Sequence, residues 1–411
     1  MINSDLNSVK ERATSSATKG AIMNNSNLPV QNPVATPEPK VVVHVVQHLR
    51  PGGIECLALE MLKHSHDEIH IVSLEGNAAE SLAHWPRLKE YSSRLYFLNK
   101  YSGWRPSVVK QLKEIFSALK AEVIHTHHIG PLIYAGTAAR LARVKHRIHT
   151  EHDAWHLTGL KRRLLEFLAL QWARPHLVAD ANLVAENVQN AGLRYPVTVI
   201  ENGIDSQHFS PGDQAEALDA LGLNKLLGRT RESAKQSGGS LQIIGAAGRL
   251  VAEKGYRVLI DSMKELPESV VLLIAGEGPL KDELTQQIQT HNLERRVFLL
   301  GNLSDMLPFY QAIDLFVLAS NKEGLPLSPL EAQACNKPVV LTDVGACKEA
   351  CCEESGLLVP ANDSQALSWA IRRQLRQLVP DNETASPRKF VEEHRDIRQM
   401  ILAYQQLLES E

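Results

Sequence analysis

The sequence predicts an α/β protein made of two doubly wound domains, and three observations support this fold class. Short β-branched segments alternate with segments of helical periodicity, which is the pattern of βαβ units and parallel sheets. The pattern forms two series, divided near residues 203–212. A chain of 411 residues also exceeds what one ordinary hydrophobic core accommodates. We therefore expect two Rossmann-like domains that face a cleft, at 40–205 and 206–385.

The first series begins after a segment that has no hydrophobic periodicity. Residues 1–39 are rich in Ser, Asn, Thr and Pro, and they predict a disordered tail. A buried strand is then expected at 40–46, followed by the glycine turn QHLRPGGIE and a helix. Further strands of this domain are predicted at 68–74, 94–98, 122–127, 146–152, 176–182 and 196–203.

The second series predicts six strands and a closing helix. The strands are expected at 241–248, 270–278, 297–301, 315–320, 338–345 and 356–360. Residues 225–240 are basic, polar and glycine-rich, so they predict a mobile insertion before the first of these strands. The segment 386–411 predicts one C-terminal helix.

The composition excludes several classes of protein. Its 44% hydrophobic and 22% charged residues are ordinary for a soluble globular chain, and a net charge of −3 argues against nucleic-acid binding by bulk charge. No segment approaches the roughly 18 consecutive apolar residues of a membrane span, and no secretory signal is visible. Five cysteines fit a reducing cytoplasm. Cys347, Cys351 and Cys352 cluster without completing a zinc motif, which favours packed thiols.

The turns that follow strands are where ligands bind in open parallel sheets. Arg249 and Lys254 follow the strand at 241–248, and a guanidinium and an ammonium group suit a diphosphate, although a solvated basic loop explains them equally well. Gly276 and Gly278 follow the next strand and permit close approach of a base or phosphate. Lys281 stands where the dinucleotide fingerprint needs its third glycine, which disfavours a nicotinamide dehydrogenase.

Two glutamates follow the strand at 315–320. Ser328, Pro329 and Glu331 fit the N-cap, N1 and N3 positions of a helix, so a capping box accounts for Glu331. It does not account for Glu323, nor for the adjoining 324–326, whose N–H groups would lie at a helix N-terminus that attracts anions. We therefore predict that this turn binds a polyhydroxylated, phosphorylated ligand.

These motifs resemble the glutamate-pair motif of retaining glycosyltransferases of family four (group 1), which have the GT-B fold. The resemblance also rests on GGIE (52–55), VIHTHH (123–128), HTEHD (149–153), ENGID (201–205), GRLVAEKG (248–255) and AGEGP (275–279). The matches follow the family's order from residue 41 to about 360. Asn336 and Ala346 depart from the pattern, because relatives often have glycine at both positions.

The resemblance implies roles for the second-domain residues. Glu323 is expected to contact hydroxyls of a donor sugar, and Glu331 to accept hydrogen bonds from a ribose. Arg249 and Lys254 would neutralise the diphosphate that leaves with extra negative charge. Backbone groups would hold the sugar or its phosphate, and the residues assigned to this contact are Gly278, Gly324 and Leu325.

The resemblance also implies roles for the first domain. Gly52 and Gly53 would meet the phosphates, and His152 matches the family's active-site histidine near the donor sugar. For His152 alone, a structural role is an equal alternative. His125 and His127, on another post-strand turn of this domain, are assigned to the acceptor. The histidines lack the ligand spacing of a zinc motif, so no metal is expected.

The activity implied is transfer of a glycosyl group, with retention, from a UDP- or GDP-linked sugar to a glycan or lipid-linked acceptor. The closest functional context is bacterial exopolysaccharide or lipopolysaccharide assembly. No cofactor is expected, and no D-x-D motif is present. A nucleotide-sugar 2-epimerase and a non-catalytic nucleotide-sugar-binding protein remain alternatives.

Residues 157–177 combine basic and apolar side chains at helical spacing. The basic residues are Lys161, Arg162, Arg163 and Arg174. Such a helix could lie on the anionic inner face of a membrane and reach a lipid-linked acceptor. A helix packed within the first domain, with an ordinary basic face, is the alternative.

Overall fold

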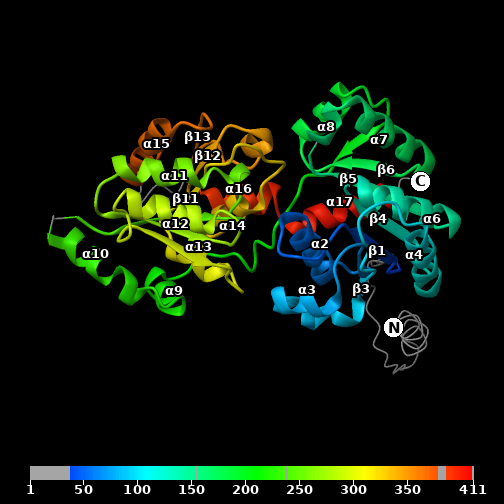
Figure 1. Ribbon diagram of the computed structural model, residues 1–411, viewed down its shortest axis with the longest axis horizontal. Coiled ribbons are helices and arrows are strands. Elements are labelled where there is room, and N and C mark those ends of the chain that lie inside the picture. The colour runs from blue at the N-terminus through cyan, green and yellow to red at the C-terminus, as the bar shows by residue number, and fades with distance from the viewer. Residues whose placement is uncertain (1–37, 154, 237–238, 378–385, 410–411) are drawn as a thin grey trace, which may run out of the picture. The chain divides into compact units, whose positions relative to one another are not determined.

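The structure is a computed structural model that describes residues 38–153, 155–236, 239–377 and 386–409 (Figure 1). The predicted tail at 1–39 lies almost wholly outside the described residues. The chain forms two compact units. The first contains residues up to Glu151 with His156–Val178 and Leu193–Val197, and the second contains His152–Trp155, Ala179–Gly192 and Thr198 onward. The chain therefore passes from one unit to the other several times before residue 198. The sequence predicted a single division at residue 205.

The first sheet has seven strands in the order β3-β2-β1-β4-β5-β6-β7. The strand order reverses between β1 and β4, which pair in parallel, and this reversal defines a ligand-binding position in doubly wound folds. Val43, Val45 and Ile124 on these strands pack against α4 (Pro106–Leu119). The strand bounds are β1 Val41–Val46, β2 Glu68–Ser73, β3 Leu95–Phe97, β4 Val123–His127, β5 His146–Glu151, β6 His176–Ala179 and β7 Val197–Val199.

The second sheet has six strands in the order β10-β9-β8-β11-β12-β13, and every pairing is parallel. Its order reverses between β8 and β11. The bounds are β8 Gln242–Ala247, β9 Val270–Ala275, β10 Val297–Gly301, β11 Leu315–Leu318, β12 Val339–Thr342 and β13 Gly356–Val359. All thirteen predicted strands are thus confirmed, each within a few residues.

Helices cover both faces of the second sheet (Figure 1). Alternate residues of one strand enter different cores: Leu272 packs with α11, α12 and α15, and Leu273 packs with α9, α10, α13 and α14. This alternation is the period-two geometry of a strand buried on both sides. The helices span α9 Gln214–Ala220, α10 Asn224–Gln236, α11 Tyr256–Ser262, α12 Lys281–Thr290, α13 Leu307–Ala312, α14 Leu327–Ala334 and α15 Ser364–Gln377.

The segment predicted as a mobile insertion at 225–240 is mostly helical, so that prediction is wrong. Helix α10 occupies most of it. Leu227 and Ala234 are buried, and Thr230 donates a hydrogen bond to the carbonyl oxygen of Arg295 at 3.0 Å. These residues recur every three or four positions on one helix face, and the surrounding charges hid that weak period.

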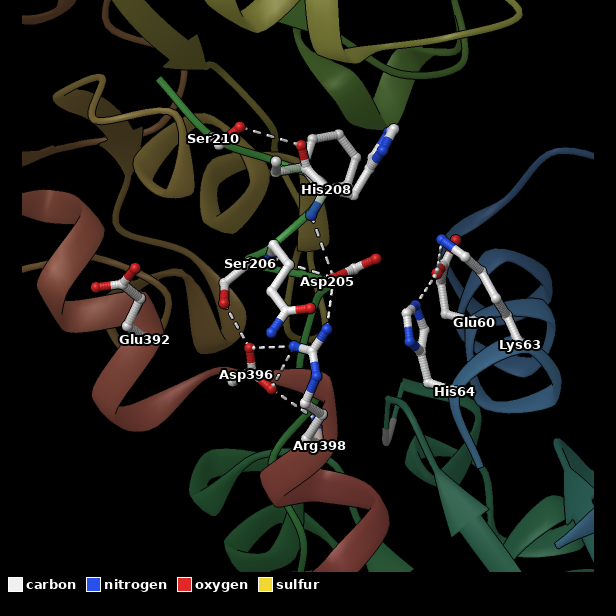
Figure 2. Close-up of polar contacts among 12 residues, drawn as sticks. Glu60, Lys63, His64, Asp205, Ser206, His208, Ser210, Glu392, Asp396 and Arg398 are labelled. Atoms are coloured by element: carbon white, nitrogen blue, oxygen red, sulfur yellow. Dashed lines mark hydrogen bonds and ion pairs between the residues drawn. The ribbon is translucent and has the colours of Figure 1, made fainter. Parts of the chain in front are cut away.

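The C-terminal segment forms two helices instead of the single predicted one. They are α16 (Pro387–His394) and α17 (Ile397–Glu409). The break is caused by a bridge between Ile204 and Asp396, in which Ile204 N donates to Arg395 O and Ile397 N donates to Ile204 O. Figure 2 shows the adjoining side-chain contacts, in which Arg398 binds Asp205 at 3.1 Å and Asp396 at 2.9 Å.

The three clustered cysteines are buried and free, as the packed-thiol interpretation predicted. Burial raises the pKa of Cys347 and of Cys351 to about 12, so both remain unreactive thiols. Within the described residues, no helix has the length and apolar character needed to cross a bilayer.

Candidate active site

The centre of the candidate site is an ion pair between the turns that follow β8 and β11. These strands are neighbours at the reversal point of the second sheet, so their carboxyl-end turns meet. Lys254 Nζ lies 2.6 Å from Glu323 Oε1, and Ser320 Oγ donates to the same oxygen at 2.6 Å. Glu323 is buried. The turn sequence offered no structural partner for Glu323, and the structure supplies two.

Glycines bring the neighbouring turns against Glu323. Gly345 follows β12 with φ +52°, and a Cβ there would lie 1.8 Å from the carbonyl oxygen of Glu323. A Cβ on Gly324 would lie 2.1 Å from the carbonyl oxygen of His152. Any larger residue at either position would displace the backbone. The predicted residues Glu323, Gly324 and His152 are therefore close neighbours.

The AGEGP turn packs on the GRL turn through its glycines. A Cβ on Gly276 would lie 2.0 Å from Gly248 O, and a Cβ on Gly278 would lie 2.5 Å from Leu250 O. The two glycines thus have a packing role, and the expected contact of Gly278 with a nucleotide stays a prediction. Arg249 is exposed, and no ion pair with its guanidinium occurs among the described residues. The guanidinium is therefore accessible to an anion.

The predicted capping box at Glu331 is wrong. Helix α14 begins at Leu327 after an N-cap at Pro326 that makes no side-chain cap, so Ser328 lies inside the first turn. Glu331 instead accepts a 2.5 Å hydrogen bond from the hydroxyl of Tyr310. Tyr310 is fully buried, so its hydroxyl holds the carboxylate of Glu331 in one orientation. The expected hydrogen bond between Glu331 and a ribose stays a prediction.

His152 contacts Asp180, which in turn is held by Asn202, and the sequence analysis missed both residues. His152 Nδ1 lies 2.9 Å from Asp180 Oδ2, and Asn202 Nδ2 donates to the same oxygen at 2.7 Å. Burial raises the pKa of Asp180, while His152 and Asn202 partly counteract this effect. Asp180 directly follows β6, and Asn202 lies in the ENGID motif, so a search of every post-strand polar residue would have found both.

Gly52 and Gly53 form the N-terminus of α2 (Gly53–His64), directly after β1 in the first unit. Gly52 is extended and makes no side-chain cap. The carboxylate of Glu55 lies at the same helix end, because a Cβ on Gly52 would be 2.4 Å from Glu55 Oε2, and its other oxygen lies 3.2 Å from His48 Nδ1. This negative charge opposes an anion there, and the contact of Gly52 and Gly53 with phosphates stays a prediction.

His125 and His127, which were expected on a turn after a strand, lie within β4 itself. Both are buried, with 1% and 0% of their surface exposed. His125 Nε2 lies 2.7 Å from Thr150 Oγ1, and His127 Nε2 lies 3.1 Å from His44 Nδ1. All five residues of β4 are buried, so a position within this strand differs from one on the turn after it. Their contact with an acceptor stays a prediction, and burial leaves little of either side chain accessible to one.

Two buried groups have ligand atoms spaced closely enough for a metal. In the first group the ligand atoms of His44, His125 and His127 lie within 4.8 Å of one another. The second group combines His149 with two glutamates, 151 and 166. His44 Nδ1 lies 3.1 Å from His127 Nε2 in the first group, and His149 Nε2 lies 2.8 Å from Glu151 Oε1 in the second. Burial lowers the pKa of His44 to about 3, which keeps it neutral. The expectation of no metal stays a prediction.

A polar pocket of about 330 Å³ lies beyond β1, β2 and β3 in the first unit, and the sequence analysis missed it. Lys100 Nζ pairs with Glu75 Oε1 at 3.2 Å in its wall. Tyr101 is 70% exposed and also lines the pocket, as do Ser81 and Ser102. Hydroxyl groups, an ion pair and an accessible aromatic ring together suit a sugar.

Two doubly wound parallel sheets in one chain are the architecture of the GT-B fold. The family model "Glycosyltransferase Family 4" matches residues 51–208, and "Glycosyl transferases group 1" matches residues 229–394. The chain belongs to these glycosyltransferases. Anabaena Alr3699/HepE in complex with UDP has the same fold, with a TM-score of 0.71 at 21% identity over 90% of this chain and 100% of that one.

Two curated relatives extend the comparison. A lipopolysaccharide core biosynthesis mannosyltransferase, LpsB of Rhizobium meliloti, is 34% identical over 46% of this chain and 53% of its own length. The match thus spans about half of that relative. An Escherichia coli UDP-Gal:alpha-D-GlcNAc-diphosphoundecaprenol alpha-1,3-galactosyltransferase is 28% identical over 65% of this chain and 71% of its own.

Proposed function

We propose that this protein transfers a sugar from a nucleoside diphosphate, UDP or GDP, to a glycan or lipid-linked acceptor of a bacterial surface polysaccharide. The observation that carries the proposal is the Lys254–Glu323 pair at the reversal point of the second sheet. The names of the relatives support an assembly role in lipopolysaccharide or exopolysaccharide synthesis. The expected site is the inner face of the cytoplasmic membrane.

The donor diphosphate would be neutralised by Arg249 and Lys254. Lys254 has 22% of its side chain exposed, so it can hydrogen-bond a phosphate while it retains Glu323. Glu323, fixed by Lys254 and Ser320, then accepts hydrogen bonds from sugar hydroxyls. Preorganised positive charge of this kind stabilises the diphosphate as it leaves, without a metal ion.

The reaction proceeds with retention by front-face attack. The bond between the anomeric carbon and the diphosphate oxygen breaks, and a bond to the acceptor oxygen forms on the same face. The acceptor proton passes to the departing phosphate oxygen, so no protein residue is assigned as acid or base. Asp180 fixes the ring of His152 beside the donor sugar, where the ring orients a sugar hydroxyl.

The acceptor sugar would occupy the pocket at the ends of β1, β2 and β3. Tyr101 would stack on the apolar face of the sugar, and the Lys100–Glu75 pair would bind its hydroxyls. Contact of residues 157–177 with the membrane would bring a lipid-linked acceptor within reach.

Substitution of the central carboxylate tests the proposal. Glu323→Gln keeps the shape of the side chain and removes its charge, so we expect turnover to fall while UDP or GDP still binds. Wild-type turnover in this variant at saturating donor would refute the assignment. A panel of sugar nucleotides in a thermal-shift assay identifies the donor. Nucleotide release without acceptor indicates the 2-epimerase alternative, and binding without turnover indicates the non-catalytic one.

A further inference from the structure

Helix α7 (Leu160–Ala173) presents a row of large apolar side chains to solvent. Leu160, Leu164, Leu168 and Trp172 follow one another at intervals of four residues and therefore share one helix face. Their exposed fractions are 75%, 59%, 55% and 49%, and Leu165 beside them is 48% exposed. Single exposed leucines are common on protein surfaces, but a continuous row is typical of an interaction site.

The opposite face of α7 buries a glutamate. Glu166 is 1% exposed, and its Oε1 lies 3.5 Å from His149 Nε2 on β5. The same nitrogen lies 2.8 Å from Glu151 Oε1. This inner face also buries Leu170 and Ala173, so α7 carries apolar side chains on both faces, and the outer leucines are not needed for its packing. Rotation of the leucines toward the core would withdraw Glu166 from His149, and the buried pair therefore holds the apolar row outward.

The charges near the row have one sign. The segment 157–177 contains four Lys and Arg residues and a single acidic residue, Glu166, which points inward. Lys161 and Arg162 are exposed. Arg140 of α6 (Thr137–Leu141) lies over the Trp172 ring at 4.4 Å. The outer surface of the helix thus combines apolar side chains with positive charge.

We infer that this face of α7 docks on an anionic lipid bilayer. Leucine and tryptophan side chains enter the boundary between head groups and acyl chains, and basic residues bind anionic head groups. A second copy of the chain fits less well, because a two-fold interface places the same patch on both sides and would oppose Lys161 and Arg162 to their own copies. This inference specifies the proposed membrane contact and rests on that part of the proposed function alone.

Vesicle sedimentation with the full chain tests the inference without donor or acceptor. We expect binding to vesicles of 7:3 phosphatidylcholine and phosphatidylglycerol, and at least tenfold weaker binding to phosphatidylcholine alone. Leu164→Ser with Leu168→Ser should weaken binding to the anionic vesicles at least tenfold, as should Lys161→Glu with Arg162→Glu. The matched control is Leu402→Ser on α17, where the leucine is 53% exposed, and it should bind like the wild type.

Several results would overturn the inference. They are absence of wild-type binding, equal binding to neutral vesicles, and wild-type binding by both double variants. A lipid-free dimer that dissociates in the Leu164→Ser, Leu168→Ser variant would identify a second copy as the partner instead. Circular dichroism melting of each variant confirms that it is folded. Glycosyl transfer from a water-soluble acceptor, measured in parallel, keeps failure of lipid binding distinct from failure of the proposed reaction.

Discussion

Lys254 and Glu323 form a 2.6 Å ion pair although 69 positions separate them in the sequence. The pair joins the turn after β8 to the turn after β11, so it depends on the order of the strands in the second sheet. In the proposed reaction Lys254 binds both this carboxylate and the diphosphate, which couples the position of the sugar to the position of the nucleotide. We expect Lys254→Ala to impair donor binding and turnover together.

Arg249 should contribute mainly to donor affinity, because no ion pair holds its guanidinium among the residues that the structure describes. Loss of a charge-assisted contact to a phosphate costs about tenfold in affinity. We expect Arg249→Ala to raise the Kd for UDP or GDP by about this factor in titration calorimetry. Arg257→Ala, on the exposed surface of α11, is the control and should leave the Kd unchanged. Equal affinities for wild type and Arg249→Ala would remove Arg249 from the donor site.

Gly345 should be irreplaceable for a steric reason. Alanine there would place a Cβ against the carbonyl oxygen of Glu323, in addition to the strain of φ +52°. Gly222→Ala is a matched control, because Gly222 has φ +67° and nothing within 4 Å of its Cβ position. We expect the control to lose about 1–2 kcal/mol of unfolding free energy and Gly345→Ala to lose more. Urea denaturation measures both losses, and equal values would contradict the clash.

The His149 group predicts a dependence of stability on pH. Burial alone would lower the pKa of His149, but hydrogen bonds with Glu151 and Glu166 outweigh it and raise the pKa from 6.5 to about 9. The folded state therefore binds the proton more tightly, and its stabilisation is complete below pH 6.5 and lost as the pH rises through 9. The shift corresponds to about 3 kcal/mol at most.

Urea denaturation between pH 6 and pH 9.5 checks this prediction. The wild type should lose stability as the pH rises, and Glu166→Gln should lose less because one of the two stabilising carboxylates is gone. Glu114→Gln, on the surface of α4, should follow the wild type. A Glu166→Gln variant with the full wild-type dependence would show that Glu166 does not raise the pKa of His149.

Asp180 should act by positioning His152. Asp180→Asn keeps the size of the side chain but changes the partner of His152 Nδ1 and removes the charge. Small misplacements of a group beside the reacting atoms cost up to about 100-fold in rate, so we expect kcat to fall between about 10- and 100-fold with little change in Tm. Asp219→Asn, at the surface contact with Asn224, is the control. An unchanged kcat and pH profile would give Asp180 a structural role only.

The strands were predictable because they are short, β-branched and buried on both faces, as VVVHVV and VVLLIA illustrate. Helix α10 was not, since its buried face is carried by Leu227, Thr230 and Ala234 among many polar residues. The start of α14 was misplaced because Ser328 and Glu331 form a capping pattern two residues after the observed N-cap, Pro326. The local sequence pattern predicted that Glu331 would cap its own helix. In the structure Glu331 accepts a hydrogen bond from Tyr310 of α13 instead.

Pairings between distant residues were beyond the reach of the sequence. Nothing in the sequence around His149, Glu151 and Glu166 indicates that these three residues meet. Only the structure shows that Glu166 of α7 points inward, toward His149 of β5. His125 and His127 were expected on the turn after a strand, but both lie within β4 and are buried. Asp180 and Asn202 lie at predictable positions after strands, but the hydrogen bond between them was not predictable.

The bridge between Ile204 and Asp396 gives the order of synthesis a structural consequence. Glu201 pairs with Arg395 across 194 positions, and a Cβ on Gly203 would lie 2.7 Å from the carbonyl oxygen of Asp396. A ribosome must therefore add almost two hundred residues before the ENGID segment meets its partners. Until Arg398 has emerged, Asp205 lacks the cation that it binds in the finished chain. A nascent chain that stalls in α16 would leave the backbone groups of Ile204 without their partners at 395–397. A protease or a chaperone can recognise such an exposed segment.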